Sequence, residues 1–345
     1  MGAMLEVSFI NSDVNFYDHS VRQMLPATPL AFLRSLTGLT VFDILGKDNS
    51  RSRVVTTLIH GNEPSGLIAA HLWLKSLEIP SVNIRIIICN PEAANTKPYF
   101  TNRYVEHSDD LNRFFAASDS DQSPVAQRAR KIVELVNEVK PEAIVDLHNT
   151  SGASPAFSVS VSEEKSHKQL VKLFTKRLIL SQLNVGAIME HAFDAPVVTI
   201  ECGGADDNSA HDIASKGLMR FINRSQLFNE NTDDIIVSKH PMRVELVEDA
   251  SVGFSKQRLA TTDLTLRADI EMLNHRLTKP GEFIGWCDPI QSMQIEAIDD
   301  NKINQIHSLF EIKNDCLFAR KQMQLFMVTT SVEIATKDCL FYVSL

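Results

Sequence analysis

Four side chains that could do metal or acid–base chemistry follow apolar runs of the chain. His60 and Glu63 lie in HGNEPSG, directly after the apolar run 54–59, His148 ends EAIVDLH, and Glu201 ends PVVTIE. Imidazole nitrogens and carboxylate oxygens are zinc donors, and a catalytic zinc takes three protein ligands and leaves a fourth position for water. Two histidines and two carboxylates could therefore supply three ligands and one base, the set that metal-assisted hydrolysis needs.

Each of these residues also has a plain structural explanation. Gly61 and Asn62 could simply form a turn, because both tolerate the backbone angles of a tight reversal. His148 could be a hydrogen-bonded core histidine, and Glu201, which precedes CGGADD, could cap a helix or lie in a loop. The metal hypothesis gains weight because all four positions follow predicted strands, where open α/β sheets form their sites.

The elements that would position these residues alternate between strand-like and helix-like segments. Apolar, β-branched runs predict strands at 54–59, 83–89, 142–148, 157–161 and 196–201. Helical spacing predicts helices at 65–77, 124–140, 167–183 and 210–223. This alternation predicts an α/β sheet with helices on both faces.

The pattern changes near His240 and Pro241. Short alternating segments such as MRVELVE, FIGWC and LFMVTT follow, and there is no internal repeat. We therefore expect a catalytic domain over residues 1–240 and a smaller β-rich domain over 241–345.

The composition excludes several classes of protein. The 345 residues carry a formal net charge of −9 without a basic run, so the electrostatic footprint of a nucleic-acid-binding protein is missing. Five scattered cysteines without a C-x-x-C pair predict neither a disulfide framework nor a thiolate zinc site. The N-terminus lacks an apolar leader and no apolar run approaches 18 residues, which predicts a cytoplasmic protein with no membrane partner. Residues 1–3, ahead of Met4, are compatible with a cloning remnant.

A polar stretch between the second and third predicted strands contains Arg103 and the tetrapeptide DLNR, residues 110–113. A guanidinium group matches a carboxylate or a developing oxyanion, both of which an acyl-transfer site must bind. The alternative is that these arginines pair on the surface with Asp109 and Asp110.

Five segments in a fixed order resemble the succinylglutamate desuccinylase and aspartoacylase family, relatives of the zinc carboxypeptidases. They are HGNE, Asn90-Pro91, RYVEHSDDLNR, DLHNT and IECGG, over residues 60–204. The resemblance implies a zinc-carboxypeptidase-like mixed sheet flanked by helices. LNHRLTKPGEF is similar to the family's C-terminal domain, which closes over the site and limits entry to small substrates.

The resemblance also implies a role for each matching residue. One zinc per chain would be held by His60, Glu63 and His148, with Glu201 as general base. Asp110 would orient His60 through a hydrogen bond that fixes the histidine tautomer. Arg103 would polarise the scissile carbonyl, and Asn112 and Arg113 would bind a substrate carboxylate.

The implied activity is zinc-dependent hydrolysis of the amide bond of a small N-acyl amino acid. A homo-oligomer is compatible with the sequence. Two rivals stay open: a zinc carboxypeptidase that acts on short peptides, and a zinc-binding protein without turnover. The C-terminal domain argues against the first, and the spare base Glu201 argues against the second.

One departure from the family pattern bears on the substrate. The family carries an arginine ten residues before the catalytic glutamate, and this chain has His191 there. Histidine cannot offer the two-pronged contact of a guanidinium group to a second acidic group, and Glu190 and Asp194 lie close by in the sequence. We therefore expect a substrate less acidic than N-succinylglutamate or N-acetylaspartate, unless Arg276 or Lys279 reaches the site.

Overall fold

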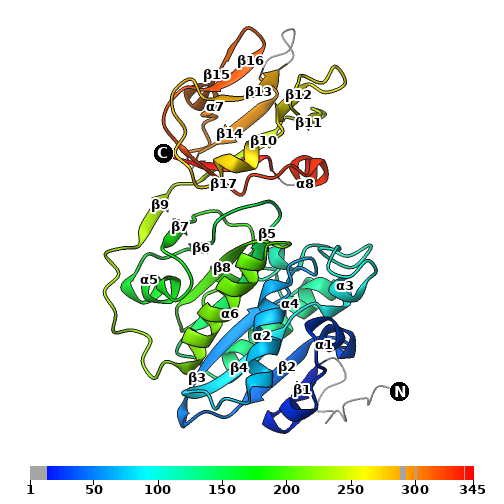
Figure 1. The fold of residues 1–345 in the computed structure, drawn as a ribbon, viewed down its shortest axis with the longest axis vertical. Coiled ribbons are helices and arrows are strands. Elements are labelled where there is room, and N and C mark those ends of the chain that lie inside the picture. Colours follow the sequence, from blue (N-terminus) through cyan, green and yellow to red (C-terminus); the bar gives the residue numbers. More distant parts are fainter. Residues whose placement is uncertain (1–13, 288–292, 300, 338) are drawn as a thin grey trace. The chain divides into compact units, whose positions relative to one another are not determined.

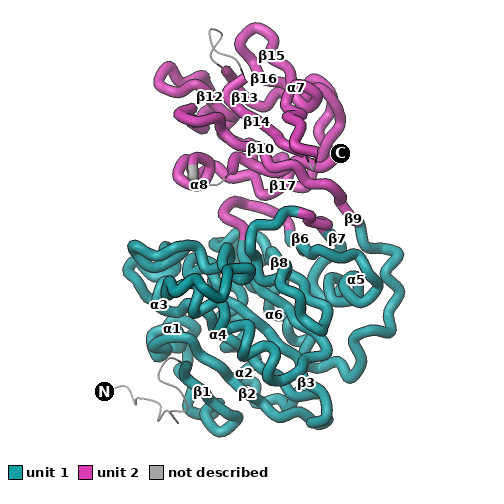
Figure 2. The backbone as a smooth tube through the Cα atoms, turned by 180° about the vertical axis from the view of Figure 1, so that it is seen from behind, with its two compact units in different colours: residues 1–149, 156–178, 183–236 teal, residues 150–155, 179–182, 237–345 magenta. Residues whose placement is uncertain are grey.

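The computed structural model describes residues 14–287, 293–299, 301–337 and 339–345. The chain divides into two compact units (Figure 2). The larger unit comprises residues up to 149 together with 156–178 and 183–236, and the smaller comprises 150–155, 179–182 and 237–345. Residues 1–3, the suspected cloning remnant, lie outside the described residues. The expected division at residue 240, with a C-terminal domain over the active site, stays a prediction.

Nine strands form one large mixed sheet, most of which lies in the larger unit (Figure 1). In spatial order the strands are β1 (Asn15–Tyr17), β2 (Thr40–Ile44), β4 (Val82–Ile88), β3 (Asp48–Thr57), β5 (Ile144–Thr150), β8 (Val197–Gly204), β6 (Phe157–Ser160), β7 (Arg177–Leu180) and β9 (Ile236–Lys239).

The centre of this sheet explains why the polar strand ends meet. Strand β3 pairs in parallel with β4 on one side and with β5 on the other. Every residue of β5 is buried, as expected for a central strand with a neighbour on each side, although Asp146 and residues 148–150 are polar. Parallel strands end at the same edge of a sheet, so the C-terminal ends of β3 and β5 lie side by side. The HGNE turn follows β3 at this edge, and His148 lies near the end of β5.

Helices cover both faces of the large sheet. On one face, α2 (Ser65–Ser76) and α6 (Asn208–Asn223) lie side by side (Figure 1). On the other face, α4 (Pro124–Glu138) buries an apolar stripe in the core cluster that contains Val54 and Ile144. The remaining helices of this unit are α1 (Pro29–Ser35), α3 (Pro91–Asn95), α5 (Lys165–Lys172) and the 3-10 helices η1 (His19–Met24), η2 (Leu111–Arg113) and η3 (Ile188–Glu190).

The smaller unit consists mainly of two sheets with their own apolar core. The four-stranded sheet has the order β14 (Ile295–Ile298), β10 (Met242–Leu246), β18 (Phe341–Ser344) and β17 (Gln324–Phe326). The five-stranded sheet has the order β11 (Val252–Ser255), β12 (Leu264–Arg267), β13 (Phe283–Cys287), β16 (Cys316–Ala319) and β15 (Phe310–Lys313). Short helices η4 (Ile270–Leu273), α7 (Ile306–Leu309) and α8 (Val332–Lys337) complete it.

The predicted fold class, a mixed α/β sheet flanked by helices with additional β-rich structure, is confirmed. The helix predicted over 167–183 is wrong, because α5 ends at Lys172 and strand β7 follows at Arg177–Leu180. Thr175 explains the break: its hydroxyl donates to the Ala156 carbonyl and accepts from the Arg177 amide, which replaces helical hydrogen bonds. In the described ranges of the chain, no helix combines the length and apolarity needed to cross a membrane.

Candidate active site

The HGNE turn is shaped by a left-handed residue and a close backbone approach. Strand β3 ends at Thr57, two residues before the predicted end, because Leu58 has a φ of 56°. At Gly61 a Cβ atom would lie 2.5 Å from the Ala94 nitrogen, so no larger residue fits without a backbone shift. The glycine next to His60 is therefore needed for this close packing.

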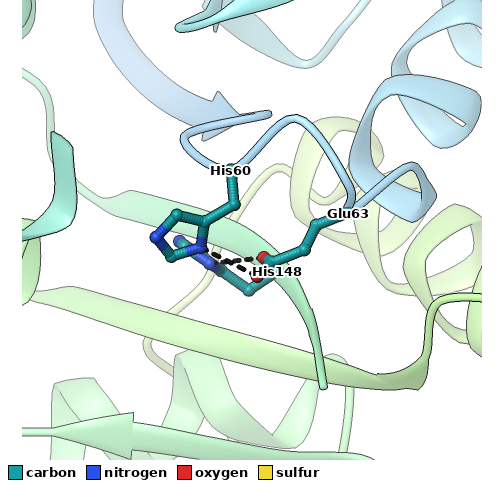
Figure 3. Close-up of side chains that lie close together, drawn as sticks. All are labelled: His60, Glu63 and His148. Carbon is teal, nitrogen blue, oxygen red and sulfur yellow. Dashed lines mark hydrogen bonds and ion pairs between the residues drawn. The ribbon is translucent and has the colours of Figure 1, made fainter. Parts of the chain in front are cut away.

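Three side chains from two strand ends converge in a buried cluster (Figure 3). Glu63 Oε1 lies 2.8 Å from His60 Nδ1, and Glu63 Oε2 lies 2.7 Å from His148 Nδ1. One donor atom from each residue falls within 4.8 Å of the others, and all three side chains are at most 7% exposed. The prediction that His60, Glu63 and His148 come together is therefore realised geometrically.

The electrostatics of the cluster favour a cation. Burial acts to raise the pKa of Glu63, but the neighbouring charges of His60 and His148 outweigh it and hold that pKa well below its usual range. Burial acts to lower the pKa of His148, yet Asp146 and Glu63 raise it well above its ordinary value. The imidazoles thus stabilise the ionised carboxylate of Glu63, and the carboxylates of Asp146 and Glu63 stabilise positive charge at His148.

Each histidine of the cluster is oriented by a second carboxylate. His60 Nε2 lies 2.9 Å from Asp110 Oδ1, in the arrangement implied for Asp110. His148 Nε2 lies 2.6 Å from Asp146 Oδ2, a contact that the sequence analysis missed. A carboxylate that accepts from Nε2 leaves the Nδ1 lone pair for a metal, and both Nδ1 atoms point toward Glu63.

The signal for Asp146 was available in the sequence. Residues two apart in a strand share a face, so the pattern Asp-x-His in a buried strand places the carboxylate beside the imidazole. Asp146 is fully buried, and its remaining oxygen accepts from the Thr56 hydroxyl at 2.7 Å. A buried carboxylate held in this way serves to fix His148.

We predict that Asp146→Asn weakens zinc binding by about 10–100-fold, the usual cost of losing the carboxylate behind a ligating histidine. The amide is isosteric but carries no charge to stabilise the Nε2–H of His148. Competition with a chromophoric chelator measures this affinity. Zinc affinity equal to that of the unmodified protein would show that Asp146 has only a packing role.

Glu201 lies on β8 beside the cluster and is 8% exposed. Its Oε2 atom is buried and has no hydrogen-bond partner among the described residues. Burial raises the pKa of this carboxyl to about 7, although the charge of His148 opposes the rise. A carboxyl group with a pKa near neutrality can both accept and release a proton during turnover.

Arg103 reaches the cluster from the long loop after α3. Its Nη2 and Nε atoms donate to Asp110 Oδ2 at 3.0 and 3.1 Å, and its Nη1 donates to Glu63 Oε1 at 3.4 Å. The Arg103 side chain is 31% exposed, so it combines a fixed position with access from solvent. Of the two acids named in the surface-pairing alternative, Asp110 contacts Arg103, and it does so beside the cluster.

Asn112 and Arg113 form part of η2, directly after Asp110. The Asn112 Oδ1 accepts from the Ile188 amide at 3.1 Å, which leaves the Nδ2 group as the donor available to a ligand. Arg113 is exposed, and its Nη1 donates to the Asn112 carbonyl at 3.2 Å. Burial acts to raise the pKa of Asp110, but His60, Arg103 and, to a smaller extent, Arg113 outweigh it and hold that pKa well below its usual range.

His191 directly follows η3, whose first residue, Ile188, donates its amide to Asn112. Its Nδ1 lies 3.1 Å from the Phe115 carbonyl, and its ring packs on Phe193. Glu190 does not point at a ligand site, because its carboxylate accepts from the backbone amides of residues 185–187. These three hydrogen bonds hold the carboxylate of Glu190 against residues 185–187, so it stabilises that loop.

Arg276 and Lys279 belong to the smaller unit. Arg276 forms an ion pair with Glu282, and the same carboxylate accepts from the Lys279 backbone amide. Glu282 thus anchors the turn on which both lie. That either cation reaches the active site stays a prediction.

The residues present fit a zinc ion. The donor set of two imidazole nitrogens and one carboxylate is that of several catalytic zinc sites. The Nδ1 atoms converge on Glu63, a carboxylate stands behind each ring, and a buried, unpaired oxygen of Glu201 lies in the same region.

Comparisons with known proteins identify the family and the fold. Residues 50–221 match the family model described as the succinylglutamate desuccinylase/aspartoacylase catalytic domain. The succinylglutamate desuccinylase structure from Vibrio parahaemolyticus is 15% identical, with a TM-score of 0.59 over 88% of this chain and 85% of that chain. Murine aminoacylase 3 is 17% identical, with a TM-score of 0.52 over 87% of this chain and 96% of that chain.

A third similar structure is the product-bound ectoine utilization protein EutE (DoeB) from Ruegeria pomeroyi. It is 15% identical, with a TM-score of 0.52 over 89% of this chain and 88% of that chain. At these identities the structural likeness shows the fold. No curated protein sequence gives a significant match to the chain.

Proposed function

The chain belongs to the succinylglutamate desuccinylase/aspartoacylase family, and on this premise we propose that it is a zinc-dependent amidohydrolase. Its substrate would be a small N-acyl amino acid or related compound, cleaved to a carboxylate and a free amine. The observation that carries the proposal is the buried cluster of His60, Glu63 and His148 beside the unpaired oxygen of Glu201. Three ligands alone would suffice to bind a metal, whereas a buried base beside them favours a site that activates water for hydrolysis.

His60, Glu63 and His148 would hold the ion. Zinc bound there supplies a Lewis acid and lowers the pKa of its water toward about 7. Asp110 and Asp146 keep both imidazoles in the tautomer that offers Nδ1.

Glu201 acts as the proton carrier in the proposed reaction. It takes a proton from the attacking water as the new C–O bond forms at the carbonyl carbon. It then gives this proton to the amine nitrogen as the C–N bond breaks, so that water and amide yield acid and amine in balance. The role of base falls to Glu201, whose Oε2 has no hydrogen-bond partner among the described residues, because Glu63 already contacts both histidines.

Arg103 would stabilise the developing oxyanion. Its contacts with Asp110 and Glu63 fix the guanidinium beside the ligand cluster while part of the side chain stays accessible. A preorganised cation at this point favours the tetrahedral transition state over the neutral carbonyl of the substrate.

Arg113 is proposed to bind a free carboxylate of the substrate together with the Nδ2 group of Asn112. We predict that Arg113→Lys lowers kcat/KM for N-acyl amino acids by about 10-fold or more, because lysine cannot reproduce a bidentate contact. The matched carboxamide substrates, which carry no such charge, should lose much less. Equal losses on acids and carboxamides would assign Arg113 a structural role.

His191 is proposed to select against a second acidic group. Because Nδ1 faces the Phe115 carbonyl and donates to it, the neutral imidazole presents the Nε2 lone pair, which cannot donate to an anion. We predict that monoanionic N-acyl amino acids are hydrolysed with a higher kcat/KM than N-succinylglutamate or N-acetylaspartate. His191→Arg should raise kcat/KM for the two dianions by about 10-fold or more, since it restores a charge-assisted contact.

A clear preference of the unmodified protein for either dianion would contradict this selectivity. That result would bring Arg276 or Lys279 back as the residue that binds the second acidic group.

The proposed activity is tested by incubating the zinc-loaded protein with N-acyl amino acids and, separately, with short peptides while free amine is followed. Release from N-acyl amino acids alone is the expected result. Release from peptides alone would identify a carboxypeptidase, and zinc binding without release from either would identify a binding protein.

None of the five cysteines forms a disulfide within the described residues, and four of them are buried. This state fits a reducing compartment, and it supports the proposal that the protein acts in the cytoplasm.

A further inference from the structure

Asn149 directly follows His148 on β5, and its side chain is buried, with the residue 3% exposed. Successive residues of a strand point to opposite faces, so Asn149 leaves the sheet on the side opposite to His148. This is the side on which α2 packs, since a Cβ at Gly66 of α2 would collide with Leu147. Asn149 thus lies beneath the start of α2, next to the HGNE turn.

Every hydrogen-bonding group of the Asn149 side chain is engaged. Its Oδ1 accepts from the Ser65 amide at 2.9 Å, and its Nδ2 donates to Ser65 Oγ at 2.8 Å and to the Gly203 carbonyl at 2.9 Å. Its backbone amide donates to Glu63 Oε2 at 3.1 Å. Asn149 therefore contacts both the HGNE turn, through Glu63, and strand β8, through Gly203.

The contact with Ser65 caps a helix from outside. The first amides of a helix need acceptors, and Pro64, the residue before α2, provides no side-chain cap. Asn149 supplies the missing acceptor from a neighbouring strand. Because Glu63 stands just two residues before Ser65, this cap fixes the turn that carries the metal ligand.

The contact with Gly203 fixes the other half of the site. Gly203 lies on β8 two residues after Glu201. Since Nδ2 donates to Ser65 Oγ and Gly203 at once, a single amide group sets the distance between the start of α2 and the end of β8. The Ser65 hydroxyl, which accepts from Asn149, also lies 2.7 Å from His211 Nδ1, and this hydrogen bond extends the link to α6.

We propose that Asn149 is a positioning residue that fixes the zinc ligand Glu63 and the base Glu201 relative to each other. It acts on Glu63 through the cap at Ser65 and on Glu201 through the Gly203 carbonyl. The inference rests on the proposed function, because it takes the two glutamates as ligand and base. It does not require Asn149 to touch the substrate.

Two substitutions separate the two halves of this role. Asn149→Ala removes the cap and the link to Gly203. Zinc should therefore bind about 10–100-fold more weakly, as when other residues that support metal ligands are lost, and kcat should fall by about 10-fold or more. Asn149→Asp keeps an oxygen for the Ser65 amide but has no hydrogen to donate to Gly203. It should keep zinc affinity near the unmodified value and lose kcat by about 10-fold or more, with a smaller change in KM.

Gln169→Ala is the matched control. Gln169 is also 3% exposed, and its carboxamide donates to the Glu230 carbonyl at 2.7 Å, in a part of the larger unit that carries no proposed site residue. Its removal should lower the melting temperature. Zinc affinity and kcat should stay within about threefold of the unmodified values, since sites that share no partners act independently.

Zinc affinity is measured by chelator competition and kcat by amine release, on samples shown to be folded at the assay temperature. The inference is overturned by Asn149→Ala binding zinc within about threefold of the unmodified protein, by Asn149→Asp retaining full kcat, or by Gln169→Ala causing equal losses. If Asn149→Ala does not fold, kcat of Asn149→Asp decides. Lack of zinc-dependent turnover in the unmodified protein would overturn the proposed function as well, which distinguishes the two failures.

Discussion

Replacement of His148 by alanine is expected to remove zinc and abolish turnover. His148 offers Nδ1 to the proposed ion, and it separates the carboxylates of Glu63 and Asp146, with contacts of 2.7 and 2.6 Å. Its loss would leave two ligands, too few for a catalytic site, and two buried carboxylates that repel each other. Bound metal should fall from one zinc per chain to background in elemental analysis, and amine release should fall below detection.

His71→Ala is the control for the loss of a buried histidine. His71 is 1% exposed and lies on α2, where its Nε2 contacts the Pro26 carbonyl at 2.8 Å. This variant should be less stable but keep zinc and turnover. Unchanged turnover in folded His148→Ala would contradict the ligand assignment.

Glu201→Gln should retain zinc and lose turnover by about 10²–10⁴-fold, the usual contribution of a general base. The amide has nearly the same volume as the carboxyl group, and Oε2 makes no hydrogen bond within the described residues that the substitution would break. The fall should therefore appear in kcat, with KM little changed. Steady-state kinetics and elemental analysis on one preparation give both quantities.

The same substitution at Glu63 provides the contrast. Glu63→Gln should lose zinc, because an amide is a poor ligand and Glu63 sits between both histidines. Loss of zinc from Glu201→Gln with retention in Glu63→Gln would mean that the two carboxylates have the opposite roles.

The convergence of His60 and His148 could be predicted from the sequence because two parallel strands end at one edge of a sheet. Glu201 was predicted at the same edge because it also ends a predicted strand. The pattern HGNE suggested the turn, but it could not show that Gly61 is required by the backbone of Ala94, since that contact joins distant segments.

What the sequence analysis missed depends on packing between elements. Asp146 could have been found from its spacing to His148, whereas the link from Asn149 to Gly203 requires knowing which strand lies next to β5. The helix predicted over 167–183 failed because an apolar run at 178–180 suits a strand as well as a helix, and sheet pairing decided between them.

The most direct test of the account is zinc-dependent release of amine. The protein is freed of metal with a chelator, assayed with a monoanionic N-acyl amino acid, and assayed again after one equivalent of zinc is added. The account predicts no release from the metal-free protein, recovery of release with zinc, and no recovery in Glu201→Gln despite equal zinc binding. Full release by the metal-free protein would contradict it.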